Sequence, residues 1–251
     1  MTVAGRLGRL PAARDPRVPR MADYVRAVAP SGAIRWGAAV ASWPMALNDR
    51  LGCCTIAGVA HAKQMYGVIG GAERVMSDAE VEAGYRRFGY APGNPASDQG
   101  AVEEDVLRSW LQDGFVIGGV LDRIEAFASI APADVAGVMT GLSVFGAVYL
   151  GVVLPAYVRE QDVWHVPAAP SAADLAPLGG HCVLAVEAEP PTGPDSCLTV
   201  VTWGALQRVT WGWWLACGEE AHVIDHPDWT RPGSLSGVDR AGMRAAMAAL
   251  A

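Results

Sequence analysis

The chain has 251 residues, of which 51% are hydrophobic and 18% are charged, so it can form a packed core and is not a disordered chain. Its formal net charge of −7 and its lack of a long basic run argue against a nucleic-acid partner. No apolar run approaches the ~20 residues that span a bilayer, and the first residues lack the apolar core of a secretory signal. We therefore expect a cytoplasmic protein with no membrane partner.

The cysteine content predicts free thiols. Cys53 and Cys54 are adjacent, whereas Cys182, Cys197 and Cys217 are scattered, and an odd number without paired spacing is not a disulfide framework. A disulfide between the adjacent pair would silence Cys54 and remains open as a redox alternative. The chain has no C-x-x-C motif and its five histidines are dispersed, so neither a metal site nor a cofactor is predicted.

The first half of the chain predicts an arm followed by helices. Residues 1–45 contain several prolines and little periodicity, which indicates an extended N-terminal arm that lies on the surface and packs across the body of the protein. Residues 46–125 form a predicted helical lobe. Helices are expected over about 54–70, 77–88 and 101–113, from helical spacing, a capping box and an apolar stripe, respectively.

The second half, residues 126–251, predicts strands. Strands are expected over 142–154, 181–188, 197–203 and 209–214, with the second and third forming a hairpin across a proline-rich loop, and helices are expected around 134–141 and over 238–251. Helices followed by strands that are connected by loops indicate an α+β fold with an antiparallel sheet.

Cys54 and His181 are the residues with the clearest chemical potential. A thiol in the first turn of a helix meets unpaired N–H groups, which favour the thiolate, although a small buried core residue explains Cys54 equally well at this point. His181 follows two glycines at a strand start, where a base is accessible. His61 lies two helical turns from Cys54 and cannot be its partner. The histidines expected at the surface are His165, His222 and His226.

Three segments in order resemble the papain-like cysteine peptidases, and the resemblance covers most of the chain. Asn48, Gly52 and Cys54 hold the places of that family's oxyanion glutamine, glycine and nucleophile. The run from Gly180 through His181 to Val183 is similar to the family's Gly-His-Ala-Val, 127 residues after Cys54. The tryptophan-glycine pairs similar to the family's are Trp203-Gly204 and Trp211-Gly212. Further similarities are to a bacterial and phage branch whose substrates are undefined.

The resemblance implies a two-lobed fold with a helical N-terminal lobe, an antiparallel β-sheet or barrel C-terminal lobe, and a cleft between them. It implies that Cys54 is the nucleophile, that His181 is the base, and that the Asn48 amide and the Cys54 N–H stabilise an oxyanion. It further implies that Trp203 shields His181. The residues that it places along the substrate are Gln99, Gly100, Gly180 and Trp203.

Two departures from the family pattern bear on activity. Asn48 is one methylene shorter than the glutamine that it replaces, and losing one oxyanion donor typically costs about 10²- to 10³-fold in rate. Val201 takes the place of the asparagine that orients the histidine, and it cannot accept a hydrogen bond. The predicted hairpin register brings Thr202 near His181, so Thr202 is the candidate replacement.

Three functions remain open from the sequence. The first is a thiol hydrolase, a peptidase or amidase that forms an acyl-enzyme on Cys54. The second is an acyltransferase that passes the acyl group to an amine or thiol, with a thioester substrate or a carrier or partner protein. The third is a catalytically decayed binding scaffold, which the replacements at Asn48 and Val201 favour.

Overall fold

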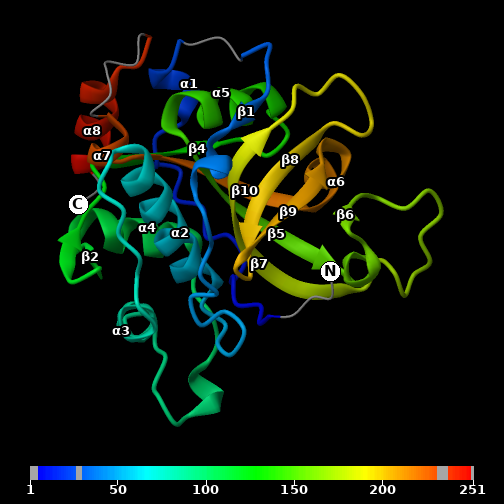
Figure 1. Cartoon of the computed structure of the whole chain (residues 1–251), viewed down its shortest axis with the longest axis horizontal. Coiled ribbons are helices and arrows are strands. Elements are labelled where there is room, and N and C mark those ends of the chain that lie inside the picture. The colour runs from blue at the N-terminus through cyan, green and yellow to red at the C-terminus, as the bar shows by residue number, and fades with distance from the viewer. Residues whose placement is uncertain (1–4, 27–29, 231–236, 250–251) are drawn as a thin grey trace.

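The computed structural model describes residues 5–26, 30–230 and 237–249. The helices α2, α3 and α4 gather on one side of the molecule and a large, mostly antiparallel sheet occupies the other (Figure 1). This arrangement confirms the α+β class expected from the sequence. No helix in the described part of the chain is both long and apolar enough to cross a membrane.

The main sheet has the strand order β4-β10-β5-β7-β8-β9-β6, with β1 paired to β7. All these neighbours are antiparallel except β6 and β9, which are parallel. A separate hairpin joins β2 and β3. The strands are β1 (Ile34–Arg35), β2 (Phe115–Ile117), β3 (Val120–Asp122), β4 (Ala126–Ile130), β5 (Val148–Pro155), β6 (Val163–Trp164), β7 (Pro177–Ala188), β8 (Cys197–Thr202), β9 (Ala205–Thr210) and β10 (Gly218–Asp225).

Most helices are short, and α2 is the longest of those described. The α-helices are α1 (Met21–Tyr24), α2 (Cys54–Ile69), α3 (Asp78–Arg86), α4 (Glu103–Gln112), α5 (Val135–Phe145), α6 (Trp211–Cys217), α7 (Pro227–Thr230) and α8 (Arg240–Ala248). The 3₁₀ helices are η1 (Trp36–Ala39), η2 (Pro95–Ser97) and η3 (Ala156–Glu160). The capping box predicted at the start of α3 is present, because Ser77 and Glu80 bond each other's backbone N–H groups.

Helix α2 packs directly on strand β7, and this contact positions the candidate nucleophile. The helix is buried on nearly all sides, as its apolar sequence predicts. At Gly58 the helix approaches the sheet so closely that a Cβ would lie 2.5 Å from the Tyr149 ring and 3.2 Å from Cys182 Sγ. The Tyr149 hydroxyl also donates to the Thr55 carbonyl oxygen at 2.6 Å. The N-terminus of α2 is thereby held against the start of β7.

The hairpin of β7 and β8 has the register that the sequence predicts. Leu184 pairs with Val201 and Ala188 with Leu198, and the loop joining the two strands is the proline-rich segment. The end of β8 therefore returns to the level of His181, and Trp203 adopts a positive φ of 45° at the turn into β9.

Two predicted strands differ from the structure, whereas the inward face of the closing helix agrees with it. The strand expected over 209–214 is the end of β9 followed by α6, because the hydroxyl of Thr210 caps a helix at Trp213 N–H. The strand expected over 142–154 begins only at Val148, since α5 continues to Phe145. The closing helix buries Met243 and Met247 as expected, whereas Leu250 lies outside the described residues.

Strand β10 was missed entirely, and with it the burial of two histidines. No strand was predicted over 218–225, but β10 lies inside the sheet between β4 and β5. The prediction that His222 and His226 are surface residues is therefore wrong: their exposed fractions are 2% and 1%. His165 is exposed as expected.

Candidate active site

Cys54 is the first residue of α2 and is almost fully buried. The backbone N–H of Cys182, the residue that follows His181, donates to Cys54 Sγ at 3.4 Å. The structure therefore brings the candidate nucleophile to the strand that carries the candidate base. Cys53 and Cys54 are both free thiols, without the disulfide that the sequence left open. The Cys53 thiol instead points to the Ala46 carbonyl oxygen, at 3.4 Å.

The loop before Cys54 is held by Asp98, which the sequence did not single out. One carboxylate oxygen of Asp98 accepts both the Gly52 N–H at 2.8 Å and the Tyr85 hydroxyl at 2.7 Å. The Tyr85 oxygen in turn accepts the Gly100 N–H at 2.8 Å. This network ties the loop before the nucleophile to the predicted groove residue Gly100. The side chain of Gln99 bonds its own loop at the Ala96 carbonyl oxygen instead, and Gln99 is exposed.

His181 is fully buried and is fixed on two sides. Its Nε2 lies 2.7 Å from the Thr202 hydroxyl oxygen, and its ring stacks on Trp203 with the centroids 4.5 Å apart and the planes at 18°. Val201, by contrast, is buried with its backbone paired to Leu184. The Nδ1 atom of His181 has no hydrogen-bond partner among the described residues, so it is the ring nitrogen that is free for proton transfer.

The N-terminal arm crosses this site. The Arg9 N–H donates to the Gly180 carbonyl oxygen at 3.1 Å, on the histidine side. On the nucleophile side, the Arg6 N–H donates to the Asn48 carbonyl oxygen at 2.7 Å and the Ala101 N–H donates to the Gly8 carbonyl oxygen at 2.9 Å. Residues 5–10 are therefore bonded to both sides of the site.

Glycines let the arm approach so closely. A Cβ on Gly8 would lie 1.8 Å from the Gly52 carbonyl oxygen, and one on Gly5 would lie 1.9 Å from a ring atom of Trp203. Neither space admits a side chain without movement of the arm, because the obstacle at Gly8 is backbone.

Asn48 uses its amide on the arm and on its own loop. Its Nδ2 donates to the carbonyl oxygens of Arg6 and Leu51, each at 3.0 Å. The Trp203 Nε1–H also donates to the Arg6 oxygen, at 3.3 Å. A primary amide has two N–H protons, so with the arm in place Asn48 has none left for an oxyanion.

Burial keeps both Cys54 and His181 neutral. It raises the pKa of the Cys54 thiol to about 12, although the N–H groups of Cys182 and Gly8 and the charge of Arg9 act in the opposite direction. Burial, followed by the charge of Arg9, lowers the pKa of His181 to about 3. The thiolate that the sequence favoured at the start of α2 is therefore not the form of this arm-covered site at neutral pH, because desolvation exceeds the effect of the helix terminus.

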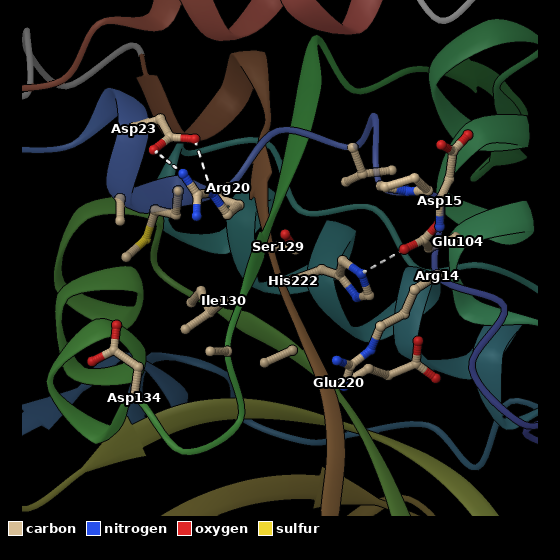
Figure 2. Close-up of a pocket in the computed structure, with 16 residues that line it drawn as sticks. Arg14, Asp15, Arg20, Asp23, Glu104, Ser129, Ile130, Asp134, Glu220 and His222 are labelled. Atoms are coloured by element: carbon tan, nitrogen blue, oxygen red, sulfur yellow. Dashed lines mark hydrogen bonds and ion pairs between the residues drawn. The ribbon is translucent and has the colours of Figure 1, made fainter.

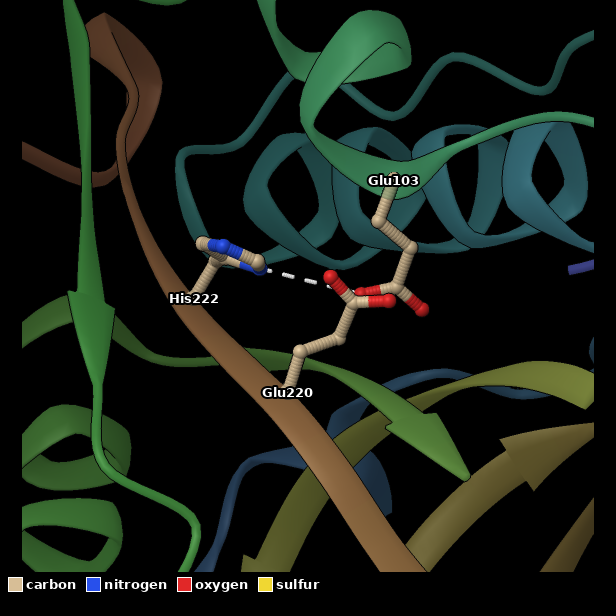
Figure 3. Close-up of side chains that lie close together, drawn as sticks. All are labelled: Glu103, Glu220 and His222. Carbon is tan, nitrogen blue, oxygen red and sulfur yellow. Dashed lines mark ion pairs between the residues drawn. The ribbon is translucent and has the colours of Figure 1, made fainter. Parts of the chain in front are cut away.

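Arg9 inserts its side chain into a cluster of carboxylates, another feature that sequence analysis missed, in which Glu103 and Glu220 are buried and the Glu219 side chain is 44% exposed. The Arg9 guanidinium forms ion pairs with Glu219 and with Glu220, the latter at 2.7 Å. Glu103 and His222 lie beside them, with their side chains directed toward Glu220 (Figure 3). Burial raises the pKa of Glu103 to about 7. His222 is also desolvated, but its neighbouring carboxylates raise its pKa to about 9.

A pocket of 460 Å³ opens next to this cluster, away from Cys54 and His181. Arg14 and Glu220 line one part of it, and His222 points toward Glu104 (Figure 2). Neither Cys54 nor His181 lines it. The arm itself occupies the space at the candidate dyad.

Two groups of described residues have the spacing of metal ligands. Glu103, Glu220 and His222 form one, and the other contains Asp122, His226 and Asp228. Each group already has a basic side chain bonded to it: Arg9 bonds Glu220 in the first, and the Lys63 ammonium pairs with Asp122 and Asp228 in the second. Each group therefore already contains a cationic partner for at least one of its carboxylates.

Solved structures of cysteine proteases share this fold. Xylellain, a cysteine protease from Xylella fastidiosa, is 15% identical with a TM-score of 0.66 over 90% of this chain and 98% of that chain. The procathepsin B S9 of Trypanosoma congolense is 11% identical with a TM-score of 0.62 over 88% and 86%. The cysteine protease and lectin-like domains of Cwp84 from Clostridium difficile are 12% identical with a TM-score of 0.61 over 90% and 57%.

No protein-family model and no curated protein sequence matches the chain. At these identities the structural likeness demonstrates the fold, and the chain has the papain-like two-lobed fold that the sequence resemblance implied.

Proposed function

We propose that the protein is a latent thiol hydrolase, a peptidase or amidase that uses Cys54 and His181 once its N-terminal arm has left the site. One chain of contacts carries the proposal. Thr202 bonds His181 Nε2, and the next residue after His181 donates its N–H to Cys54 Sγ. A base with one fixed nitrogen and one free nitrogen, adjacent to a thiol at a helix start, suits nucleophilic catalysis.

The proposed reaction begins with transfer of the Cys54 proton to His181 Nδ1. The sulfur then forms a bond to the carbonyl carbon of the substrate, and the carbonyl electron pair moves to oxygen. When this pair returns, the C–N bond breaks and the imidazolium gives its proton to the leaving amine. Water next attacks the thioester carbonyl while His181 takes its proton, and the sulfur leaves with that proton as the thiol.

Departure of the arm is required for this sequence. The Arg6 carbonyl oxygen accepts hydrogen bonds from both Asn48 and Trp203. In the proposed reaction, an oxygen of the substrate takes this position. When the arm leaves, one N–H of Asn48 becomes available to an oxyanion. Removal of the arm also returns water to Cys54 and His181, which lowers the pKa of the thiol and raises that of the imidazole.

A substitution that displaces the arm tests the proposal. In Gly8→Ala the new Cβ meets the Gly52 backbone, whereas in Gly32→Ala, the matched control, it meets nothing within 4 Å. We expect iodoacetamide to label Cys54 at least ~100-fold faster in Gly8→Ala than in the unsubstituted protein or Gly32→Ala, because a lower pKa raises the thiolate fraction. Hydrolysis of a fluorogenic peptide library should appear in Gly8→Ala and vanish when Cys54→Ser is added.

The outcome of labelling separates the readings. Slow labelling of Cys54 in Gly8→Ala, at the rate of the other cysteines, would contradict an activated thiol and favour the binding scaffold. The full use of the Asn48 amide is the observation that favours that second candidate. Fast labelling, with acyl groups passed from Cys54 to added amines but not to water, would instead favour an acyltransferase. The peptide, amide or thioester substrate, the carrier or partner protein and the cytoplasmic location stay predictions.

Thr202 is proposed as a positioning residue for His181. Thr202→Val removes the hydroxyl and keeps the shape, so in the Gly8→Ala background it should lower kcat and shift the acidic limb of the pH–rate profile. Thr202→Ser should restore both. An unchanged profile in Thr202→Val would show that the hydroxyl only fills space.

A further inference from the structure

The geometry points to a guanidinium-binding subsite in the cleft: we propose that the pocket filled by Arg9 receives an arginine side chain of the substrate after the arm departs. This inference rests on the proposed function, since it names the substrate class of the same site. It is carried by the position of Arg9, by the way the pocket is built, and by the charge left behind when Arg9 leaves.

Arg9 lies one residue from the arm backbone that touches the thiol. The Gly8 N–H acts on Cys54, and the Arg9 N–H donates to the carbonyl oxygen of Gly180, the residue before His181. A peptide whose backbone replaced the arm at these contacts would direct one of its side chains into the same pocket. The pocket is therefore within a residue of the proposed reaction.

The pocket is shaped for a long, planar side chain. A Cβ on Gly151 would lie 2.9 Å from Arg9 Cδ and 2.5 Å from Glu220 Cγ, and one on Gly180 would lie 2.2 Å from the Arg9 carbonyl oxygen. The two glycines on neighbouring strands thus leave the space that the arginine occupies. The Arg9 side chain is 1% exposed, so its aliphatic stem and its charged end are both enclosed.

A bulge in β10 aims two successive glutamates at Arg9. Successive residues of a strand normally point to opposite faces of the sheet. The register of β10 on β5 shifts between Gly218 and Glu220, which makes Glu219 an extra residue. As a result Glu219 and Glu220 bond different nitrogens of the same guanidinium, and the Val152 carbonyl oxygen accepts from it at 3.4 Å.

The pocket holds more negative charge than Arg9 alone neutralises. Glu103 is fully buried, neither of its carboxylate oxygens has a hydrogen-bond partner in the described chain, and it points into the cluster (Figure 3). Glu220 Oε2 is likewise without a hydrogen-bond partner there. When the arm leaves, only His222 remains to offset Glu103 and Glu220. Buried carboxylates without a cation are costly, so the vacated pocket favours a new cation.

The arrangement selects a guanidinium over an ammonium. Arg9 Nη1 and Nη2 are each bonded to a different glutamate, and the Val152 carbonyl oxygen, which stays when the arm leaves, also accepts from Nη2. A planar fork with several fixed donors matches this set, whereas an ammonium is a single point of charge. Arginine is therefore the side chain expected in the substrate.

Binding to the emptied pocket tests the inference without any turnover. The protein is the full chain carrying Cys54→Ser and Arg9→Ala, and the probes are Nα-acetyl-arginine methylamide and its neutral citrulline isostere, titrated by calorimetry in EDTA. The arginine probe should bind at least ~10-fold more tightly than the citrulline probe, because its bonds to the glutamates are charge-assisted. Adding Glu220→Gln should remove that preference. Glu82→Gln, which removes a carboxylate paired with Arg86 on the surface, should leave it unchanged.

Equal affinity for the two probes, or a preference that survives Glu220→Gln, would overturn the guanidinium subsite. If Arg9→Ala loses its circular dichroism spectrum, Arg9→Ser is the second variant, because it also vacates the pocket. Because the titration needs no nucleophile, arginine selectivity without Cys54 labelling in Gly8→Ala would refute the hydrolase and keep the subsite. If Cys54 is labelled in Gly8→Ala but peptides containing arginine and citrulline are cleaved equally, the hydrolase would be supported and the subsite refuted.

Discussion

The described residues include two clusters in which a buried basic side chain pairs with carboxylates. The two clusters are chemically alike, but their basic side chains come from different parts of the chain. In one, Lys63 pairs with Asp122 and Asp228 beside His226. In the other, Arg9 pairs with Glu219 and Glu220 beside His222. Both therefore place a basic side chain among carboxylates next to a histidine at or near β10. The difference lies in where the cation comes from.

Lys63 lies in the middle of α2, a helix buried on nearly all sides, so its ammonium cannot leave without disruption of the core. Arg9 lies on the arm, whose backbone is held by hydrogen bonds at a few positions around it. Identical chemistry thus serves two purposes: a cation fixed in a core helix stabilises the fold, whereas a cation on a removable segment can be exchanged. Substitutions in the two clusters should therefore have different effects, and Gly151→Ala tests the contacts of the Arg9 side chain alone.

The largest expected effect is on stability, from Lys63→Met. This substitution leaves buried carboxylates without their ammonium, and breaking a buried pair in this way costs about 3–5 kcal/mol. Urea unfolding should show this loss, with no change in the slow labelling of Cys54. Arg9→Met should cost less than half as much, since the arm can lift and let water reach the glutamates. Equal losses in the two variants would show that both clusters are structural.

The two clusters should also differ in their response to alkaline pH. The carboxylates around His222, from Glu103, Glu104 and Glu220, raise its pKa to about 9 from the ordinary value of 6.5, against the effect of burial and of nearby Arg9. Since the folded state holds this proton more tightly, the stability from His222 is fully present below pH 6.5 and is lost as the pH rises through 9. The loss amounts to about 3 kcal/mol for a shift of this size.

Urea midpoints measured from pH 6.5 to 9 check this sign, with His222→Gln as the comparison. Buried thiols also lose stability in alkali, because their pKa values are raised on folding, but they do so equally in both proteins. The difference between the two slopes therefore isolates His222. Parallel slopes would mean that His222 is neutral in the folded protein, as a metal ligand or a plain core residue would be.

Smaller changes in the free energy of unfolding, of opposite sign in the two clusters, are expected when one carboxylate in each cluster is replaced by an amide. Glu103→Gln removes a buried carboxylate that has no hydrogen bond within the described residues, and above pH 9 its ion-pair partner His222 is neutral, so we expect the free energy of unfolding at pH 10 to rise by about 1 kcal/mol. Asp122→Asn should lower it, because the Asp122 carboxylate accepts from Trp110 at 2.9 Å and pairs with Lys63 at 3.1 Å. Destabilisation of similar size in both variants would contradict an excess of negative charge around Arg9.

The sequence allowed the fold class, the β7–β8 hairpin and the capping box of α3 to be predicted because each depends on local signals. A proline-rich loop, an apolar strand and a Ser-x-x-Glu start are all read within a few residues. The close placement of Cys54, His181 and Thr202 followed from the hairpin register together with the family resemblance. Their roles stay predictions.

The burial of the Arg9 side chain and strand β10 could not be predicted, because both depend on partners far away in the chain. Arg9 looked like one of several surface arginines, and only contact with Glu219 and Glu220, more than 200 residues later, buries it. Strand β10 was not predicted, since nothing local showed that an arginine would pair with its two glutamates. The one local signal for the close approach was the two glycines, Gly5 and Gly8, that flank Arg6 and Leu7, which we interpreted as part of an extended arm.

The smallest effect is expected from a substitution in the pocket that holds the Arg9 side chain. Gly151→Ala places a methyl group 2.5 Å from Glu220 Cγ, so the Arg9 side chain must give up part of its contact. We expect about a threefold rise in the labelling rate of Cys54, equivalent to ~0.6 kcal/mol of weaker arm binding. Gly193→Ala, where the methyl group meets nothing within 4 Å, is the matched control. If Gly151→Ala leaves labelling unchanged, the backbone contacts of residues 5–10 hold the arm without the Arg9 side chain. The ion pairs of Arg9 would then not control the release of the arm.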